Sequence, residues 1–168
     1  MILAYIIFFI TTIYCFSPLH LVKLKQMVQV ELERKDDGFA FEAIDSSGLT
    51  IKMDAGKNFG GNNFGISPMQ SLLMALGGCS GIDVVSILQK QRQTISSFKI
   101  VVNGNREEGV EPSLWTSVDV QFLLIGAIDF EKAKRACSLS IDKYCSVAET
   151  LRRSGCTISW DVKVNELP

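Results

Sequence analysis

The sequence has very little histidine and no excess of charge of either sign. Its one histidine, His20, lies near the N-terminus, ahead of the segments that show strand and helix patterns. Catalysis by a cysteine–histidine pair is therefore not expected in the folded region, and neither are most zinc sites. Lys and Arg together number 17 and Asp and Glu 18, so nothing indicates the basic patch that nucleic-acid binding needs.

No cofactor or metal is predicted. The glycine-rich stretch 60–65, GGNNFG, lacks the lysine of a phosphate-binding loop. The five cysteines are odd in number and irregularly spaced, which argues against a disulfide framework and against a clustered metal site. The chain has 168 residues, of which 47% are hydrophobic and 21% are charged, and this composition is typical of one folded domain.

The first 26 residues differ from the rest. Residues 1–16 are all apolar except Thr11 and Thr12. This run is shorter than the roughly 20 residues that span a bilayer, and the positive charge that opens a secretory signal is missing. Three interpretations remain open: a mis-annotated start with translation beginning at Met27, an export or anchoring segment, or an extra helix. We expect 27–168 to form the folded domain, with a cytoplasmic location and no membrane partner unless 1–16 exports or anchors it.

The pattern from Met27 onward predicts an α+β fold. Alternating apolar and polar residues predict strands, and Ser67-Pro68 is a typical helix start. The helix that follows is apolar on nearly all sides. One small sheet cannot cover so much apolar surface, so we expect a second subunit to cover the rest in a homodimer. The predicted order is βββ-α-ββ-α-β, with a mainly antiparallel sheet and a long buried central helix. The expected elements are strands at 27–35, 39–44 and 50–53, a loop at 55–66, a helix at 69–91, strands at 94–103 and 114–125, a helix at 129–154 and a strand at 156–165.

Two cysteines are candidates for chemistry. Cys79 lies inside the central helix among three glycines, which predicts that another backbone approaches the helix there. Cys145 lies on the apolar stripe of the second helix. By spacing alone the better interpretation of either residue is a buried core cysteine, which is also how Cys137 and Cys156 are interpreted. A reactive thiol in this chain needs a cation or a hydrogen bond to lower its pKa.

Two segments carry a resemblance to a known family. The stretch 67–85, SPMQSLLMALGGCSGIDVV, resembles the first-cysteine helix of the OsmC/Ohr family, most closely its YhfA-related branch. The stretch 143–147, KYCSV, resembles the segment around the second cysteine of that family. The two cysteines also have the separation that the family shows, and the resemblance covers 27–168.

The resemblance implies an intertwined homodimer with two active sites at its interface. It implies that Cys79 is the thiol that attacks an organic hydroperoxide, that Cys145 resolves the oxidised product to a disulfide, and that a dithiol reductant restores both. The expected function is thus thiol-dependent reduction of organic hydroperoxides in oxidative stress defence. The alternative is a dimer that senses redox state or binds an apolar ligand, with weak or no peroxidase activity.

The sequence departs from the family at the positions that activate the first cysteine. Family members use an arginine and a glutamate that follows the proline at the start of the long helix, whereas Met69 and Gln70 follow that proline here. Arg34 is the one arginine before the helix, so Arg34 and Gln70 are the activation candidates. Asp83 lies one helical turn after Cys79, but a carboxylate raises the pKa of a neighbouring thiol. We therefore expect Asp83 to cap or pair elsewhere.

Overall fold

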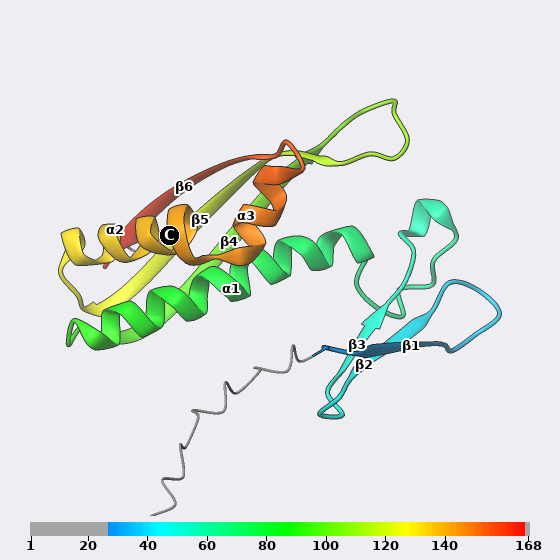
Figure 1. Ribbon diagram of the computed structural model, residues 1–168, viewed down its shortest axis with the longest axis horizontal. Coiled ribbons are helices and arrows are strands. Elements are labelled where there is room, and N and C mark those ends of the chain that lie inside the picture. The colour runs from blue at the N-terminus through cyan, green and yellow to red at the C-terminus, as the bar shows by residue number, and fades with distance from the viewer. Residues whose placement is uncertain (1–26, 167–168) are drawn as a thin grey trace, which may run out of the picture.

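The computed structural model describes residues 27–166 (Figure 1). The predicted leader or mis-annotated start at 1–26 lies outside the described residues. The predicted α+β order is confirmed, with one change in the second helical segment. The elements are β1 (Val30–Arg34), β2 (Phe41–Asp45), β3 (Thr50–Met53), the 3-10 turn η1 (Lys57–Phe59), α1 (Pro68–Lys90), β4 (Thr94–Arg106), β5 (Trp115–Ala127), α2 (Phe130–Leu139), the π-helical turn η2 (Ser140–Tyr144), α3 (Ser146–Arg153) and β6 (Thr157–Val164).

The strands form two three-stranded sheets. The first, in the order β1-β2-β3, is antiparallel throughout. The second has the order β4-β5-β6; β4 pairs antiparallel with β5, whereas β5 pairs parallel with β6. The parallel pair was not predicted; it arises because α2 and α3 carry the chain back across the sheet before β6 begins.

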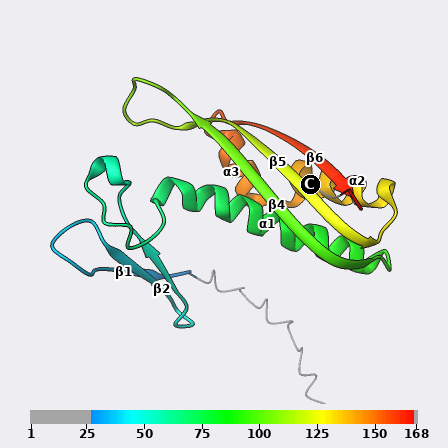
Figure 2. The same ribbon diagram turned by 180° about the vertical axis from the view of Figure 1, so that it is seen from behind.

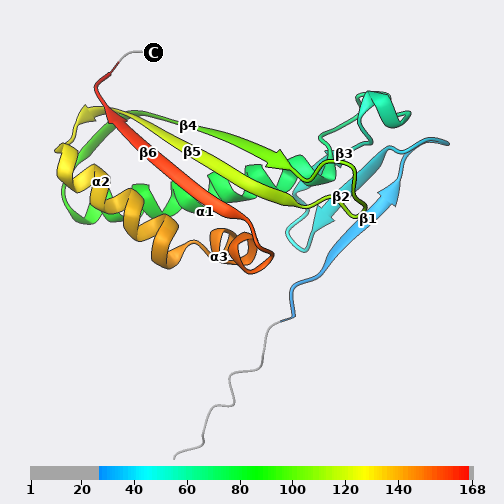
Figure 3. The same cartoon turned by 90° about the horizontal axis from the view of Figure 1, so that it is seen from above.

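The helices lie on one face of the second sheet, with α1 against β4 and α2 against β6 (Figure 3). Figures 1 and 2 both show the first sheet beyond the N-terminal end of α1, apart from this layered body. Among the described helices, α1 alone is long and apolar enough to cross a membrane by length and hydropathy. In this fold it is the helix that packs beside β4, α2 and α3.

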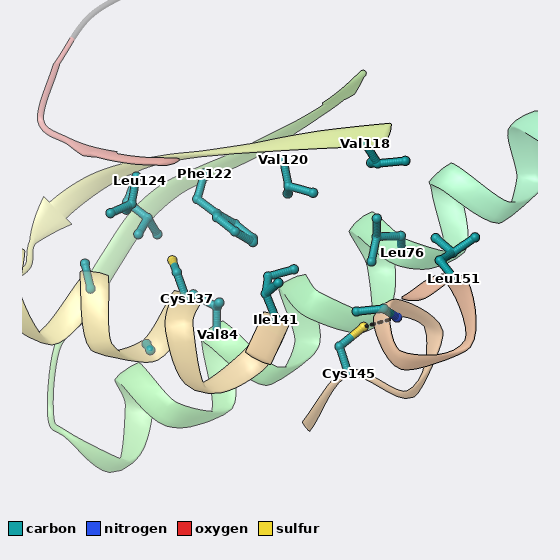
Figure 4. Packing of buried hydrophobic residues seen from close by; sticks show 14 of the residues in the cluster. Leu76, Val84, Val118, Val120, Phe122, Leu124, Cys137, Ile141, Cys145 and Leu151 are labelled. Atoms are coloured by element: carbon teal, nitrogen blue, oxygen red, sulfur yellow. Dashed lines mark hydrogen bonds between the residues drawn. The ribbon is translucent and has the colours of Figure 1, made fainter. Parts of the chain in front are cut away.

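The core lies between the second sheet and the helices (Figure 4). Alternate residues of β5 point into it, and full burial of each large side chain contributes about 1.5–3 kcal/mol. From α1, Leu76 and Val84 meet them, and α2 and η2 add Cys137 and Ile141. The inward-facing residues of β5 are Val118, Val120, Phe122 and Leu124.

The prediction of one continuous helix over 129–154 is wrong. The chain leaves the α-helix after Leu139, makes one π-helical turn and becomes extended at Cys145, with φ −69° and ψ 104°, before α3 begins. The backbone N–H of Cys145 donates to the carbonyl of Ser140 at 2.8 Å, five residues back. The segment has no glycine or proline to mark the break, so the apolar spacing looked like uninterrupted helix.

Within the described chain, Gly77 and Gly81 beside Cys79 meet side chains and not the backbone that was predicted to approach there. A Cβ on Gly77 would lie 3.3 Å from a methyl group of Val102, and one on Gly81 would lie 2.8 Å from a methyl group of Ile100. These two glycines therefore let the side chains of β4 pack directly on the helix backbone. A Cβ on Gly78 would point into open space.

The predicted loop at 55–66 is ordered around one buried carboxylate. Asp54 accepts hydrogen bonds from the backbone N–H groups of Ala55, Asn62 and Phe64 at 2.8–3.0 Å. These bonds, with that of Phe64 foremost, lower the pKa of Asp54. The loop thereby closes a few residues before α1 begins at Pro68.

Candidate functional site

Cys79 and Cys145 lie against each other although they come from different elements. Cys79 is half-buried on α1, on a face that turns toward η2 and α3. Cys145 is only 3% exposed, at the junction of η2 and α3. Their thiols are close enough that Cys79 affects the ionisation of Cys145. A half-buried thiol and a buried thiol from two separate elements are therefore neighbours, and formation of a disulfide requires such proximity.

The environment of Cys145 favours the neutral thiol. Burial raises its pKa to about 11, and the neighbouring Cys79 adds to this effect. The backbone N–H of Ala148 acts in the opposite direction, since it donates to the Cys145 sulfur at 3.4 Å (Figure 4). The same contact makes Cys145 the N-cap of α3, so the break in the helix and the placement of the sulfur have one cause.

A buried serine fixes the turn before Cys145 onto α1. The hydroxyl of Ser140 donates to the carboxylate of Asp83 at 3.1 Å and lies 3.2 Å from the carbonyl oxygen of Ser80. Asp83 therefore does pair away from the thiols, as expected from its charge. Nothing in the sequence pattern marked Ser140, because a serine on a helix is usually exposed.

Arg152 holds the same turn from its other side. Its guanidinium donates to the carbonyl of Ile141 at 2.7 Å and to the carboxylate of Asp142 at 3.3 Å. The first bond satisfies a carbonyl that the π-helical turn leaves without a regular helical partner. Sequence reasoning missed Arg152 as well, since its contacts depend on the turn that the sequence did not reveal.

The two activation candidates do not meet Cys79 within the described chain. Arg34 donates to the carbonyls of Asp37 and Gly38, so its guanidinium closes its own hairpin. Gln70 lies nine residues before Cys79, which places it on the opposite side of α1. It lines an apolar groove of about 610 Å³ between α1 and β4, together with Met74 and Ile100.

The other two cysteines of the described chain are core residues. Cys137 is fully buried on α2, and burial raises its pKa to about 12. Cys156 is buried at the start of the last strand, and burial raises its pKa too. Within residues 27–166, no cluster of three or more histidine, cysteine or acidic side chains is placed to hold a metal ion.

A family model matches the part of the chain that contains both thiols. The model of the family OsmC, described as "OsmC-like protein", matches residues 60–161. This chain belongs to the OsmC family. Protein YhfA of Escherichia coli strain K12 is similar to it, with 41% identity over 120 residues that cover 70% of this chain and 85% of YhfA.

Solved structures extend the OsmC likeness to the whole described fold. A hypothetical protein from Aquifex aeolicus VF5 superposes with a TM-score of 0.69 at 32% identity, over 84% of this chain and 99% of that one. An organic hydroperoxide resistance protein OsmC from Legionella pneumophila superposes with a TM-score of 0.65 over 84% of this chain and all of that one. At 12% identity the second likeness shows the OsmC fold alone.

Proposed function

We propose that this OsmC-family protein reduces organic hydroperoxides through Cys79 and Cys145. The observation that carries the proposal is the meeting of a half-exposed thiol and a buried thiol from two separate elements. Membership of a family with a structural neighbour described as an organic hydroperoxide resistance protein supports the substrate class.

The reaction has three steps. The sulfur of Cys79 attacks the terminal oxygen of the hydroperoxide, the O–O bond breaks, and the alcohol leaves with a proton while Cys79 becomes a sulfenic acid. The sulfur of Cys145 then attacks that of Cys79, and water leaves as the disulfide forms. A dithiol reductant finally returns both residues to thiols and is itself oxidised to a disulfide.

The second step has to remove the proton of Cys145, because the thiolate is the form that attacks. With its pKa raised to about 11, Cys145 carries its proton at neutral pH. That proton leaves with the hydroxyl group of the sulfenic acid as water. Burial also keeps Cys145 from reacting with the hydroperoxide directly, so the order of the two cysteines follows from their exposure.

A homodimer is part of the proposal because large apolar side chains remain uncovered on α1 and on the first sheet. On α1, Ile82 is 73% exposed and Met74 is 55% exposed. On the first sheet, Val30, Leu32 and Ile51 are exposed. Such surfaces are usual where a second subunit packs. A partner seated there would cover the face of α1 that Gly78 leaves open.

Full-length reduced protein treated with stoichiometric cumene hydroperoxide tests the proposal. Disulfide mapping by mass spectrometry should find a Cys79–Cys145 bond that is absent in Cys79→Ala and in Cys145→Ala. Cys156→Ala is the matched control, a buried cysteine away from the pair, and should behave as wild type. Slow oxidation scattered over several cysteines would contradict the proposal.

One observation favours a second function, a redox-sensing or ligand-binding dimer. Where other family members carry a glutamate after the helix proline, this chain has Met69 and Gln70, and Gln70 lies away from Cys79. An unactivated thiol would form the disulfide only over many minutes. Stopped-flow measurement of the first oxidation step separates the two functions, since a peroxidase should react within seconds at micromolar hydroperoxide.

A further inference from the structure

The sulfur of Cys145 makes two different contacts in the reduced protein. It accepts the backbone N–H of Ala148 at 3.4 Å and is thereby the N-cap of α3. It is also a neighbour of the Cys79 thiol on α1. As long as both cysteines are thiols, one sulfur can make both contacts. A disulfide would tie the same sulfur covalently to α1, so the two contacts compete once the pair is oxidised.

The N-cap matters because α3 is short. The helix runs over Ser146–Arg153, which is eight residues, and helices shorter than about 12 residues are unstable on their own in water. Among the described residues, Cys145 is the one whose side chain accepts from an N–H group in the first turn of α3. The last turn has other support, since Leu151 is buried there. The first turn therefore depends on the sulfur of Cys145 more than the rest of the helix does.

Forming the disulfide has to displace Cys145 more than Cys79. Cys79 lies in the interior of α1, a helix of 23 residues that packs on β4, α2 and α3. Cys145 lies at the extended junction between η2 and α3, where no helical hydrogen bonding continues through the residue. The two sulfur atoms must come within about 2.05 Å, well inside the contact distance of two separate thiols. The bonded sulfur also cannot carry the negative charge that strengthens a hydrogen bond from an N–H group.

We propose that the Cys79–Cys145 disulfide removes the sulfur cap from α3 and loosens the first turn of that helix, which makes α3 a redox-sensitive switch. The inference rests on the proposed function, since it needs the disulfide, and it adds a change of conformation that distinguishes the oxidised protein. The guanidinium of Arg152 donates to the carbonyl of Ile141 and keeps the last turn of α3 attached to η2. The loosening is therefore confined to about residues 146–150.

Hydrogen exchange measured by mass spectrometry on the full-length protein tests the switch. Diamide makes the disulfide without hydroperoxide: it takes up the two thiol hydrogens and is reduced to a hydrazine. Peptides covering 146–150 should exchange about fivefold faster after oxidation, which corresponds to the loss of one ordinary helix cap. Peptides from α2 should not change, and Cys79→Ser treated with diamide should exchange as the reduced wild type does. Equal exchange of 146–150 in reduced and oxidised wild type would overturn the inference.

Two substitutions test the cap without any oxidation. Cys145→Ala removes the acceptor and should give reduced protein the fast exchange of the oxidised wild type at 146–150. Cys145→Ser supplies a hydroxyl oxygen, a good N-cap acceptor, and should keep the slow exchange. Unchanged α2 peptides show that both variants are folded. Slow exchange in Cys145→Ala would show that the sulfur does not cap the helix and would also refute the switch.

Failure of the switch is distinguishable from failure of the proposed function. If hydroperoxide gives no disulfide but the diamide-made disulfide speeds exchange at 146–150, the peroxidase proposal fails and the switch stands. If hydroperoxide gives the disulfide but exchange at 146–150 stays the same, the switch fails and the peroxidase proposal stands.

Discussion

The hydroxyl of Ser140 donates a hydrogen bond to the carboxylate of Asp83 at 3.1 Å. This bond joins the π-helical turn that precedes Cys145 to the helix that carries Cys79. The two thiols therefore owe their relative position to a side-chain contact between residues 57 positions apart in the sequence.

Replacement of Ser140 should slow disulfide formation more than the first oxidation of Cys79. Ser140→Ala removes the donor to Asp83 and should lower the free energy of unfolding by about 1–3 kcal/mol, because a half-buried carboxylate loses its partner. After hydroperoxide treatment, dimedone should trap more Cys79 sulfenic acid than in wild type. Ser159→Ala, on β6 and away from the thiols, should not change the trapping. Unchanged trapping in Ser140→Ala would show that the contact does not position Cys145.

Arg152 and Arg153 are neighbours in the sequence, but their replacement by lysine should lower the free energy of unfolding by different amounts. Arg152→Lys keeps the charge but loses the forked contact with the carbonyl of Ile141 and the carboxylate of Asp142. It should lower the free energy of unfolding by about 1 kcal/mol or more in denaturant titration. Arg153→Lys changes an exposed ion pair with Glu149 and should cost less than about 0.5 kcal/mol. Equal effects of the two substitutions would rule out Arg152 as a support of the turn.

Stability should fall as the pH rises through the alkaline range. Burial raises the folded-state pKa of Cys145 to about 11 and of Cys137 to about 12, whereas an unfolded thiol has its usual pKa of 9.0. The folded state therefore holds protons that the unfolded state releases, and this stabilisation is complete below pH 9 and lost as the pH rises toward 12. Urea titrations at about pH 8 and pH 10.5 measure the loss, and Cys137→Ala should show less of it. Equal pH dependence in that variant would contradict the assignment.

Alanine substitutions at Gly78 and Gly81 distinguish packing within one chain from packing between two chains. Gly81→Ala should destabilise the subunit itself, since its Cβ would lie 2.8 Å from a methyl group of Ile100. Gly78→Ala meets nothing in its own chain and should raise helix stability by about 0.5–1 kcal/mol unless a partner covers that face. In the proposed homodimer it should instead weaken association in analytical ultracentrifugation. A monomeric wild type, or dimerisation unchanged by Gly78→Ala, would argue against a dimer built on this face.

Much of the secondary structure was predictable because it depends on local patterns. The strand predicted at 114–125 corresponds to β5, and Ser67-Pro68 marked the start of α1. The parallel pairing of β5 with β6 was not predicted, since nothing in a strand of eight residues states which neighbour it will meet. Register and direction follow from the route of the chain through α2 and α3, which is a property of the whole fold.

The sequence by itself determined the α+β order, the long apolar helix and the two cysteine segments that resemble the OsmC family. These features are carried by residues within a few positions of one another. Only the tertiary structure decided that the helix breaks at Cys145, that Ser140 bonds to Asp83, and that Gln70 lies on the far side of α1 from Cys79. Each of these depends on contacts between residues distant in sequence, because a buried polar group pairs with whatever the fold brings near, and local periodicity carries no record of it.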